Sequence, residues 1–87
     1  MTETEPLVYI GKKGRMNYIS ESIHKLTTHN NILVKARGRL IPEAVDVALV
    51  LRGLGKKILG IEISTDVLKD NRDNVRNVSV IAIRICN

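Results

Sequence analysis

Two short basic runs carry the most concentrated charge in the sequence. The first is the pair Lys12-Lys13 with Arg15 close behind it, and the second spans residues 35–39, where basic residues alternate with small ones. Lysine and arginine side chains donate charge-assisted hydrogen bonds to phosphate oxygens. The two runs therefore predict a surface that binds a polyanion. We call their six basic residues the basic edge: Lys12, Lys13, Arg15, Lys35, Arg37 and Arg39.

A βαβ unit would bring these two runs together. Residues 7–10 predict a strand that ends at the first run, and residues 32–37 predict a strand that contains most of the second. Between them, apolar residues recur at helical spacing from Met16 to Leu26. The carboxyl ends of parallel strands joined by a right-handed crossover lie at one edge of the sheet. We therefore expect the basic edge to converge there, with no acidic residue among its members.

Local geometry adds two expectations for this edge. An extended chain points residues two apart to the same side, so Lys35, Arg37 and Arg39 should share one face. Both predicted helices also begin at this edge, where free N–H groups and positive dipole ends favour phosphate oxygens.

The rest of the chain completes a small α+β domain. Pro42 suits the first turn of a second helix, which should run to about Arg52. Residues 57–64 and 78–85 have the apolar patterns of strands. We expect these two strands to form a hairpin with a long arm, roughly residues 65–78. We expect a two-layer β-α-β-α-β-β fold, with a mixed four-stranded sheet and both helices on one face.

Composition favours a basic, intracellular, globular protein. The net charge is +5, and two of the acids lie in residues 1–6, which we expect to be a disordered tail before a single domain over residues 7–87. A basic domain attracts nucleic acid or an acidic membrane face. The only cysteine is Cys86, so no internal disulfide is expected. No signal peptide or membrane-spanning run is visible, so we expect no membrane partner.

The scarcity of aromatic residues narrows the mode of nucleic-acid binding. Tyr9 and Tyr18 are the only two, whereas single-strand binders stack bases on aromatic platforms. The second helix is almost wholly apolar, so it does not resemble a recognition helix for base edges. What remains is contact with the phosphate backbone and the shape of a duplex, with little sequence specificity.

Three further residues are candidates with an open alternative. Arg72 and Arg76 lie in the arm, residues 66–77, which carries as many acids as bases. The arm either reaches into a minor groove or forms a solvated turn. Asn17 either donates to a phosphate or caps the first helix.

The sequence contains little that favours an enzyme. His24 and His29 have no Cys or further His at metal-ligand spacing. The Gly-Lys-Lys-Gly segment of residues 11–14 lacks the pattern of a nucleotide-binding loop. No base can be assigned to Cys86 as a nucleophile. We therefore expect no catalytic residue, no metal and no cofactor.

The second helix carries more apolar residues than one packing face requires. A helix lying on a sheet needs a single apolar stripe, yet residues 44–51 are apolar on most sides. The surplus predicts a further partner, most simply a second copy in a homodimer.

Four segments resemble the Alba family of archaeal chromatin proteins, over about residues 7–85. They read Val-Tyr-Ile-Gly-Lys-Lys from Val8, Met-Asn-Tyr from Met16, Lys-Ala-Arg-Gly-Arg from Lys35, and Ala-Val-Asp-Val-Ala from Ala44, followed by Arg52. The resemblance implies a fold similar to the C-terminal domain of translation initiation factor three. It also implies a cytoplasmic, chromosome- or nucleoid-associated homodimer that coats double-stranded DNA and binds RNA.

The resemblance also assigns roles to single positions. The central lysine pair of the family matches Lys12 and Lys13. In the family, acetylation of the first lysine of the pair weakens DNA binding. The resemblance therefore implies that Lys12 is the modified residue and that an acetylase and a deacetylase are partners. Gly14 stands where the family often has Pro, which should loosen the loop. Leu54 stands near a position where a Phe of the family often joins dimers side by side on DNA. Whether dimers of this protein pack cooperatively on DNA is therefore an open alternative.

We therefore expect sequence-independent binding of double-stranded DNA in chromosome architecture and compaction. The alternative is an RNA-binding protein of RNA processing or ribonucleoprotein assembly, because both duplexes present the same phosphates.

Overall fold

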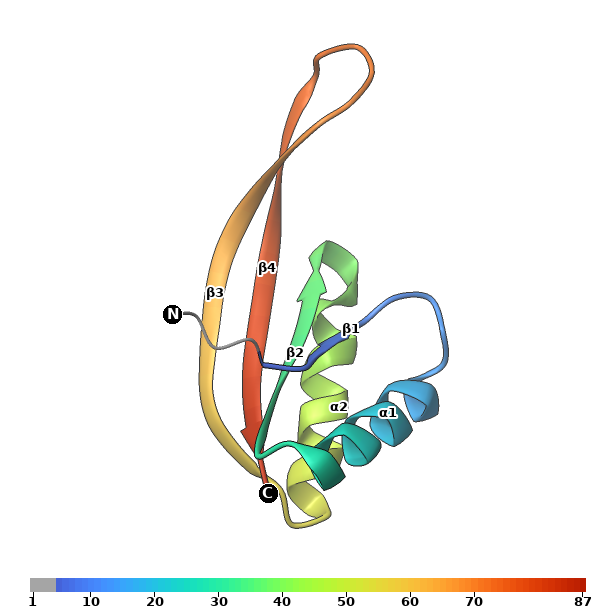
Figure 1. Cartoon of the computed structure of the whole chain (residues 1–87). Helices are drawn as coiled ribbons and strands as arrows, with labels where there is room; N and C mark the ends of the chain where they lie inside the picture. Colours follow the sequence, from blue (N-terminus) through green and yellow to red (C-terminus); the bar gives the residue numbers. More distant parts are fainter. Residues whose placement is uncertain (1–4) are drawn as a thin grey trace.

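Strands and helices follow one another in the order that the apolar periodicity predicts. In the computed structural model, which describes residues 5–87, the elements are β1 (Leu7–Tyr9), α1 (Arg15–Thr28), β2 (Asn31–Arg37), the short 3₁₀ helix η1 (Gly38–Leu40), α2 (Ile41–Gly53), β3 (Lys57–Lys69) and β4 (Val75–Cys86). The strand order is β1-β2-β4-β3, with β1 and β2 parallel and the other pairs antiparallel (Figure 1). The expected α+β fold with a mixed four-stranded sheet is confirmed.

One face of the sheet is buried because apolar residues alternate along its two central strands. Ile32, Val34 and Ala36 of β2 are fully buried, and β4 places isoleucines opposite them in register. Helices α1 and α2 cover this face, and the buried apolar residues that they contribute are Tyr18, Ile19, Leu26, Ala44, Val47, Ala48 and Leu51. The alternate residues of β2 therefore point to the face that neither helix covers. No helix within residues 5–87 is long and apolar enough to cross a membrane.

Gly38 ends β2 and changes the direction of the chain. Its φ of 54° lies in the left-handed region, which glycine adopts without the steric penalty of a side chain. The chain then forms η1, so Arg39 does not continue the extended strand. The expectation that Lys35, Arg37 and Arg39 share one face was wrong for Arg39, because the spacing-of-two argument holds only for extended backbone. Helix α2 follows at once, one residue before Pro42.

The segment between β3 and β4 is more regular than its sequence indicates. We expected the last two strands to form a hairpin with a long arm over roughly residues 65–78, and the hairpin is confirmed. Within that arm β3 continues to Lys69 and β4 begins at Val75, with a ladder from Asp66↔Val78 to Lys69↔Val75. This two-stranded ribbon extends beyond the helices (Figure 1). Backbone hydrogen bonds hold the two strands of this ribbon together. Because its side chains are mostly exposed, the sequence shows no alternation of apolar residues there.

The chain before β1 is attached to the sheet from Glu5 onward. The carboxylate of Glu5 accepts two hydrogen bonds of 2.8 Å from the Arg84 guanidinium on β4, which lowers the pKa of Glu5. The Pro6 carbonyl accepts a hydrogen bond of 2.9 Å from the amide of Leu33. The tail expected over residues 1–6 therefore does not include Glu5 and Pro6, and residues 1–4 lie outside the described residues.

Candidate nucleic-acid interface

The loop of residues 11–14, which we call the lysine loop, leaves the sheet beside β2. The amide of Ile10 donates to the carbonyl of Lys35 at 2.9 Å, so the loop starts next to the second basic run. Lys12 and Lys13 are exposed on it. The loop ends at Gly14, the residue before α1, whose carbonyl accepts the amide of Asn17 at 3.0 Å. The βαβ unit thus brings the two basic runs to the same edge of the sheet, as expected.

Arg15 is braced by acidic residues from the other helix. Its Nε lies 3.2 Å from the Glu43 carboxylate, and its terminal nitrogen lies 3.0 Å from the Asp46 carboxylate, both on α2. The hydrogen bond to Glu43, together with both negative charges, raises the pKa of Arg15. The expectation that no acid lies among the basic edge was therefore wrong. The contact of Glu43 with Arg15 depends on how α1 packs beside α2, which the sequence alone does not show.

Arg37 is also paired, on the helix-free face of the sheet. Its Nε lies 3.1 Å from the carboxylate of Asp66 on β3, and its guanidinium carbon lies 5.7 Å from the centre of the Tyr9 ring. Lys35 lies on the same face as Arg37, because the neighbouring residues Val34 and Ala36 of β2 are buried in the core and side chains alternate along a strand. The spacing argument is confirmed for these two residues, whereas Asp66 is a partner that sequence reasoning assigned to the arm.

Arg39 lies next to the base of the arm. Together with Arg76, Asn77 and Ser79 it lines an open hollow of about 320 Å³ between η1 and β4. Two arginines from segments far apart in the sequence therefore line the same open hollow. A hollow with two arginines and two hydrogen-bonding side chains suits a phosphate group or another small anion.

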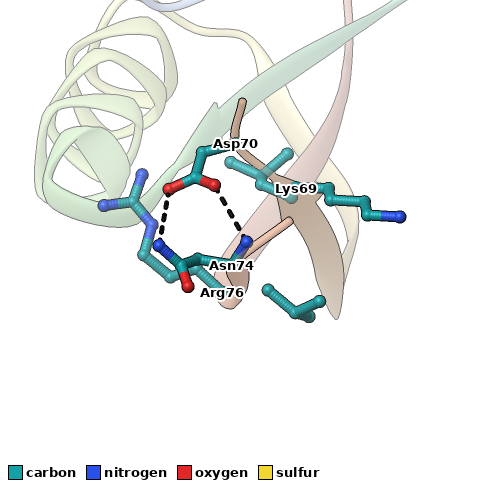
Figure 2. A pocket seen from close by; sticks show the side chains of 6 residues that line it. Lys69, Asp70, Asn74 and Arg76 are labelled. Carbon is teal, nitrogen blue, oxygen red and sulfur yellow. Dashed lines mark hydrogen bonds between the residues drawn. The ribbon is translucent and has the colours of Figure 1, made fainter. Parts of the chain in front are cut away.

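The tip of the arm is a hydrogen-bonded turn closed by Asp70. The Asp70 carboxylate accepts hydrogen bonds from the amides of Asn74 at 2.9 Å and Arg72 at 2.8 Å, and from the side-chain amide of Asn74 at 3.1 Å. These hydrogen bonds lower the pKa of Asp70, and the bond from the backbone amide of Asn74 contributes most. Figure 2 shows Lys69 and Arg76 pointing to opposite sides of this hairpin. One side of the arm thus presents Arg76 beside the hollow, and the other presents Lys69.

Asn17 does not cap α1. The residue before the helix is Gly14, and no side chain caps the helix start. The Asn17 side chain is exposed beside the lysine loop. The capping alternative is therefore wrong, and contact with a nucleic acid stays a prediction.

The charges of the site divide into paired and unpaired cations. Among the predicted cationic residues, only Arg15 and Arg37 form ion pairs with acids of residues 5–87. Lys12, Lys13 and Lys35 have no such partner in the same part of the chain. Like charges without partners repel one another in the free protein, and a bound polyanion would relieve that repulsion.

Comparisons of the sequence with known proteins find one family. A family model described as Alba matches residues 7–65. A protein named DNA/RNA-binding protein Alba from Nitrosopumilus maritimus is 34% identical over 97% of this chain and 93% of its own length. The protein of the same name from Methanococcus maripaludis is 38% identical over 88% of this chain and 92% of its own length. These names describe binding and not a catalytic activity.

Solved structures show the same fold. Alba from Thermoplasma volcanium aligns with a TM-score of 0.80 at 34% identity, and the alignment covers 93% of this chain and 99% of that one. An Alba protein from Trypanosoma brucei also gives a TM-score of 0.80, over 99% of this chain and 72% of that one, and its 21% identity shows likeness of fold alone. The matched family model and the relatives of 34–38% identity show that this chain belongs to the Alba family.

Proposed function

We propose that this protein binds double-stranded DNA without sequence preference and serves in chromosome compaction, as a cytoplasmic protein associated with the nucleoid. The observation that carries the proposal is the set of unpaired cations at one sheet edge, where the lysine loop leaves β1 beside Lys35. Backbone phosphates are the regular array of anions that such an edge fits. The names of the relatives, which describe DNA and RNA binding, support the same partner class.

The residues of the interface contribute unequally. Lys12, Lys13, Lys35 and Arg39 gain a charged partner when phosphate binds. Arg15 and Arg37 must instead exchange or share a carboxylate, so their net gain is smaller. Asn17, Arg72 and Arg76 serve as secondary contacts at the helix start and on the arm.

Base reading has little support in the described surface. Tyr9 is the only exposed aromatic ring within residues 5–87, and the guanidinium of Arg37 lies over it. The residues of α2 that face away from the core are largely apolar, such as Val45 and Leu49. We therefore assign recognition to phosphates and duplex shape.

RNA is the second candidate partner, because the relatives are named for both nucleic acids. A duplex-binding surface built on phosphates would also serve RNA processing or ribonucleoprotein assembly. The geometry of the duplex separates the two, since A-form and B-form helices space their phosphates differently.

A salt titration by fluorescence anisotropy tests this function. The protein is measured against a DNA duplex, a second DNA duplex of scrambled sequence, and an RNA duplex of the same length. Equal affinity for both DNA duplexes, with a steep fall in affinity as salt rises, is the expected result. A clear preference for the RNA duplex would favour the second candidate, and no binding at low salt would refute both.

We also propose that the protein is a homodimer through α2 and β3. The apolar surplus of α2 lies outside the core, and β3, the edge strand beside it, exposes Leu59, Ile61 and Ile63. Ile63 is 80% exposed, which is unusual for an isoleucine in a sheet. A second copy that packs on this surface would bury it and double the basic edge.

Sedimentation at several protein concentrations tests the dimer. Ile63→Glu should yield a monomer, since it places a charge on the apolar surface while leaving the monomer core intact. Leu7→Glu, at an exposed apolar position on the opposite edge strand, is the matched control and should remain dimeric. A wild-type protein that is monomeric at every concentration would refute the dimer.

Lys12 is the position where a change of charge should regulate binding. Acetylation removes the positive charge of a lysine at the centre of the lysine loop. We propose that an acetylase and a deacetylase act there, and Lys12→Gln should lower DNA affinity while Lys12→Arg retains it.

A further inference from the structure

The hydroxyl group of Tyr18 lies beneath the lysine loop. Tyr18 is on α1 and is only 4% exposed, with its ring in the core. Its hydroxyl oxygen accepts a hydrogen bond of 2.8 Å from the amide of Gly11 and another of 3.0 Å from the amide of Lys13. These two amides flank Lys12, so a single buried oxygen holds the backbone on both sides of that residue.

The close fit around this oxygen shows that the contact is part of the packed structure. A hydroxyl oxygen has two acceptor lone pairs, and the two amides match that number. A Cβ atom added to Gly11 would lie 3.2 Å from the hydroxyl oxygen, which is tighter than an ordinary contact. Glycine at position 11 therefore lets the loop backbone approach the tyrosine closely.

The lysine loop has few other means of keeping one conformation. Two of its four residues are glycines, which have wide backbone freedom, and its lysine side chains are exposed. Fixing a flexible backbone on binding costs conformational entropy, which weakens binding unless the free protein is already ordered. An anchor to the helix core removes part of that loss in advance.

We propose that Tyr18 is a positioning residue for phosphate binding: its buried hydroxyl group fixes the amides of Gly11 and Lys13, so that Lys12 and Lys13 are held ready for the nucleic acid. This role rests on the proposed function, because it acts through the lysine pair. Tyr9 offers a contrast, since it is exposed and its hydroxyl group makes no hydrogen bond within residues 5–87.

Tyr18→Phe removes the hydroxyl group and keeps the ring in the core. We expect its affinity for a DNA duplex to fall by about three- to tenfold, which is less than the full strength of two hydrogen bonds because only the cost of ordering the loop is added to binding. The slope of log affinity against log salt should stay near the wild-type value, because no phosphate contact is removed. Tyr9→Phe is the matched control and should bind as the wild type does.

Amide hydrogen exchange provides a readout that does not depend on nucleic acid. The amides of Gly11 and Lys13 should exchange faster in Tyr18→Phe, while those of the paired strands β2 and β4 should be unchanged. Unchanged exchange at both loop amides would overturn the anchor.

A double-mutant cycle separates positioning from a general structural effect. In a Lys12→Ala, Lys13→Ala background, Tyr18→Phe should cause no further loss of affinity, because there are no lysines left to position. The same fold-loss in both backgrounds would overturn the positioning role. If Tyr18→Phe does not fold, Gly11→Ala replaces it, since the added methyl crowds the hydroxyl group, and Gly60→Ala, where a Cβ meets nothing within 4 Å, is its control.

The outcomes distinguish this inference from the function on which it rests. Tight binding by both the wild type and Tyr18→Phe would overturn only the positioning role. A wild-type protein that binds no duplex at low salt would overturn the proposed function and with it the role of the anchor in binding.

Discussion

The lysine loop and the arm both expose basic side chains, yet they are held in different ways. The lysine loop is fixed to the body of the protein, by the bond from Ile10 to Lys35 and by the buried hydroxyl group of Tyr18. The arm is a two-stranded ribbon that is held by its own ladder and by the Asp70 turn (Figures 1 and 2). A rigid loop suits a fixed spacing of charges, whereas a ribbon outside the core is free to bend.

The charges of the two segments differ as well. The lysine loop contains no acid, whereas the bases of the arm are balanced by Asp66, Asp70 and Asp73. Net charge decides how strongly a segment attracts a polyanion over distance. We therefore expect the lysine loop to supply more of the affinity than the arm does.

The largest effect is expected when both lysines of the loop are removed. Lys12→Ala with Lys13→Ala should lower duplex affinity about 10- to 100-fold, because each lysine loses a charge-assisted hydrogen bond. The salt slope should fall by about one unit per lost phosphate contact. Lys56→Ala with Lys57→Ala, at the start of β3 and the residue before it, removes the same charge elsewhere and is the control. Equal losses in both pairs would mean that only the net charge matters.

A smaller effect is expected for the arm. Arg72→Ala with Arg76→Ala should lower affinity by about three- to tenfold, since these residues lie on a charge-balanced segment and contribute secondary contacts. Fluorescence anisotropy at one salt concentration measures it beside the loop variant. A loss greater than that of the loop variant would reverse the order that we propose.

The Asp70 turn should be sensitive to acid, in contrast to the lysine loop. The folded state lowers the pKa of Asp70, so its contribution to the turn is complete above the unfolded pKa and is lost as the pH falls through the folded value. The amides of Arg72 and Asn74 should therefore lose protection below about pH 4. Asp70→Ala should produce the same loss at neutral pH and leave the loop amides unchanged. Protection that persists to the lowest pH at which the domain stays folded would contradict this cause.

The smallest effect is expected from stiffening the loop. Gly14 has φ −67°, which proline also adopts, and its amide makes no hydrogen bond within residues 5–87. Gly14→Pro should raise stability by about 0.4–1 kcal/mol by restricting the unfolded chain, with at most a slight gain in affinity. Thermal unfolding measures the first and anisotropy the second. A lower Tm would mean that Lys13 cannot adopt the backbone conformation required before proline.

The amino-acid sequence determined the layers of the fold and the place of the basic residues that we predict to bind nucleic acid. Alternation along residues 32–36 and 81–85 placed the buried face, because burial imposes a period of two on a strand. The two basic runs converged as expected, because strands β1 and β2 are parallel and end at the same edge. Both features can be inferred from the sequence, because the first follows from apolar periodicity and the second from the order of strands and helices along the chain.

Only the tertiary structure decided which charges are free. Arg15 meets Glu43 and Asp46, and Arg37 meets Asp66, across about 30 positions of the sequence. Such contacts depend on how two helices or three strands pack, and solvated side chains leave no periodic signal of them. The same holds for the Tyr18 hydroxyl group: its ring follows the apolar pattern of α1, but its two amide donors are set by the path of a loop between a strand and a helix.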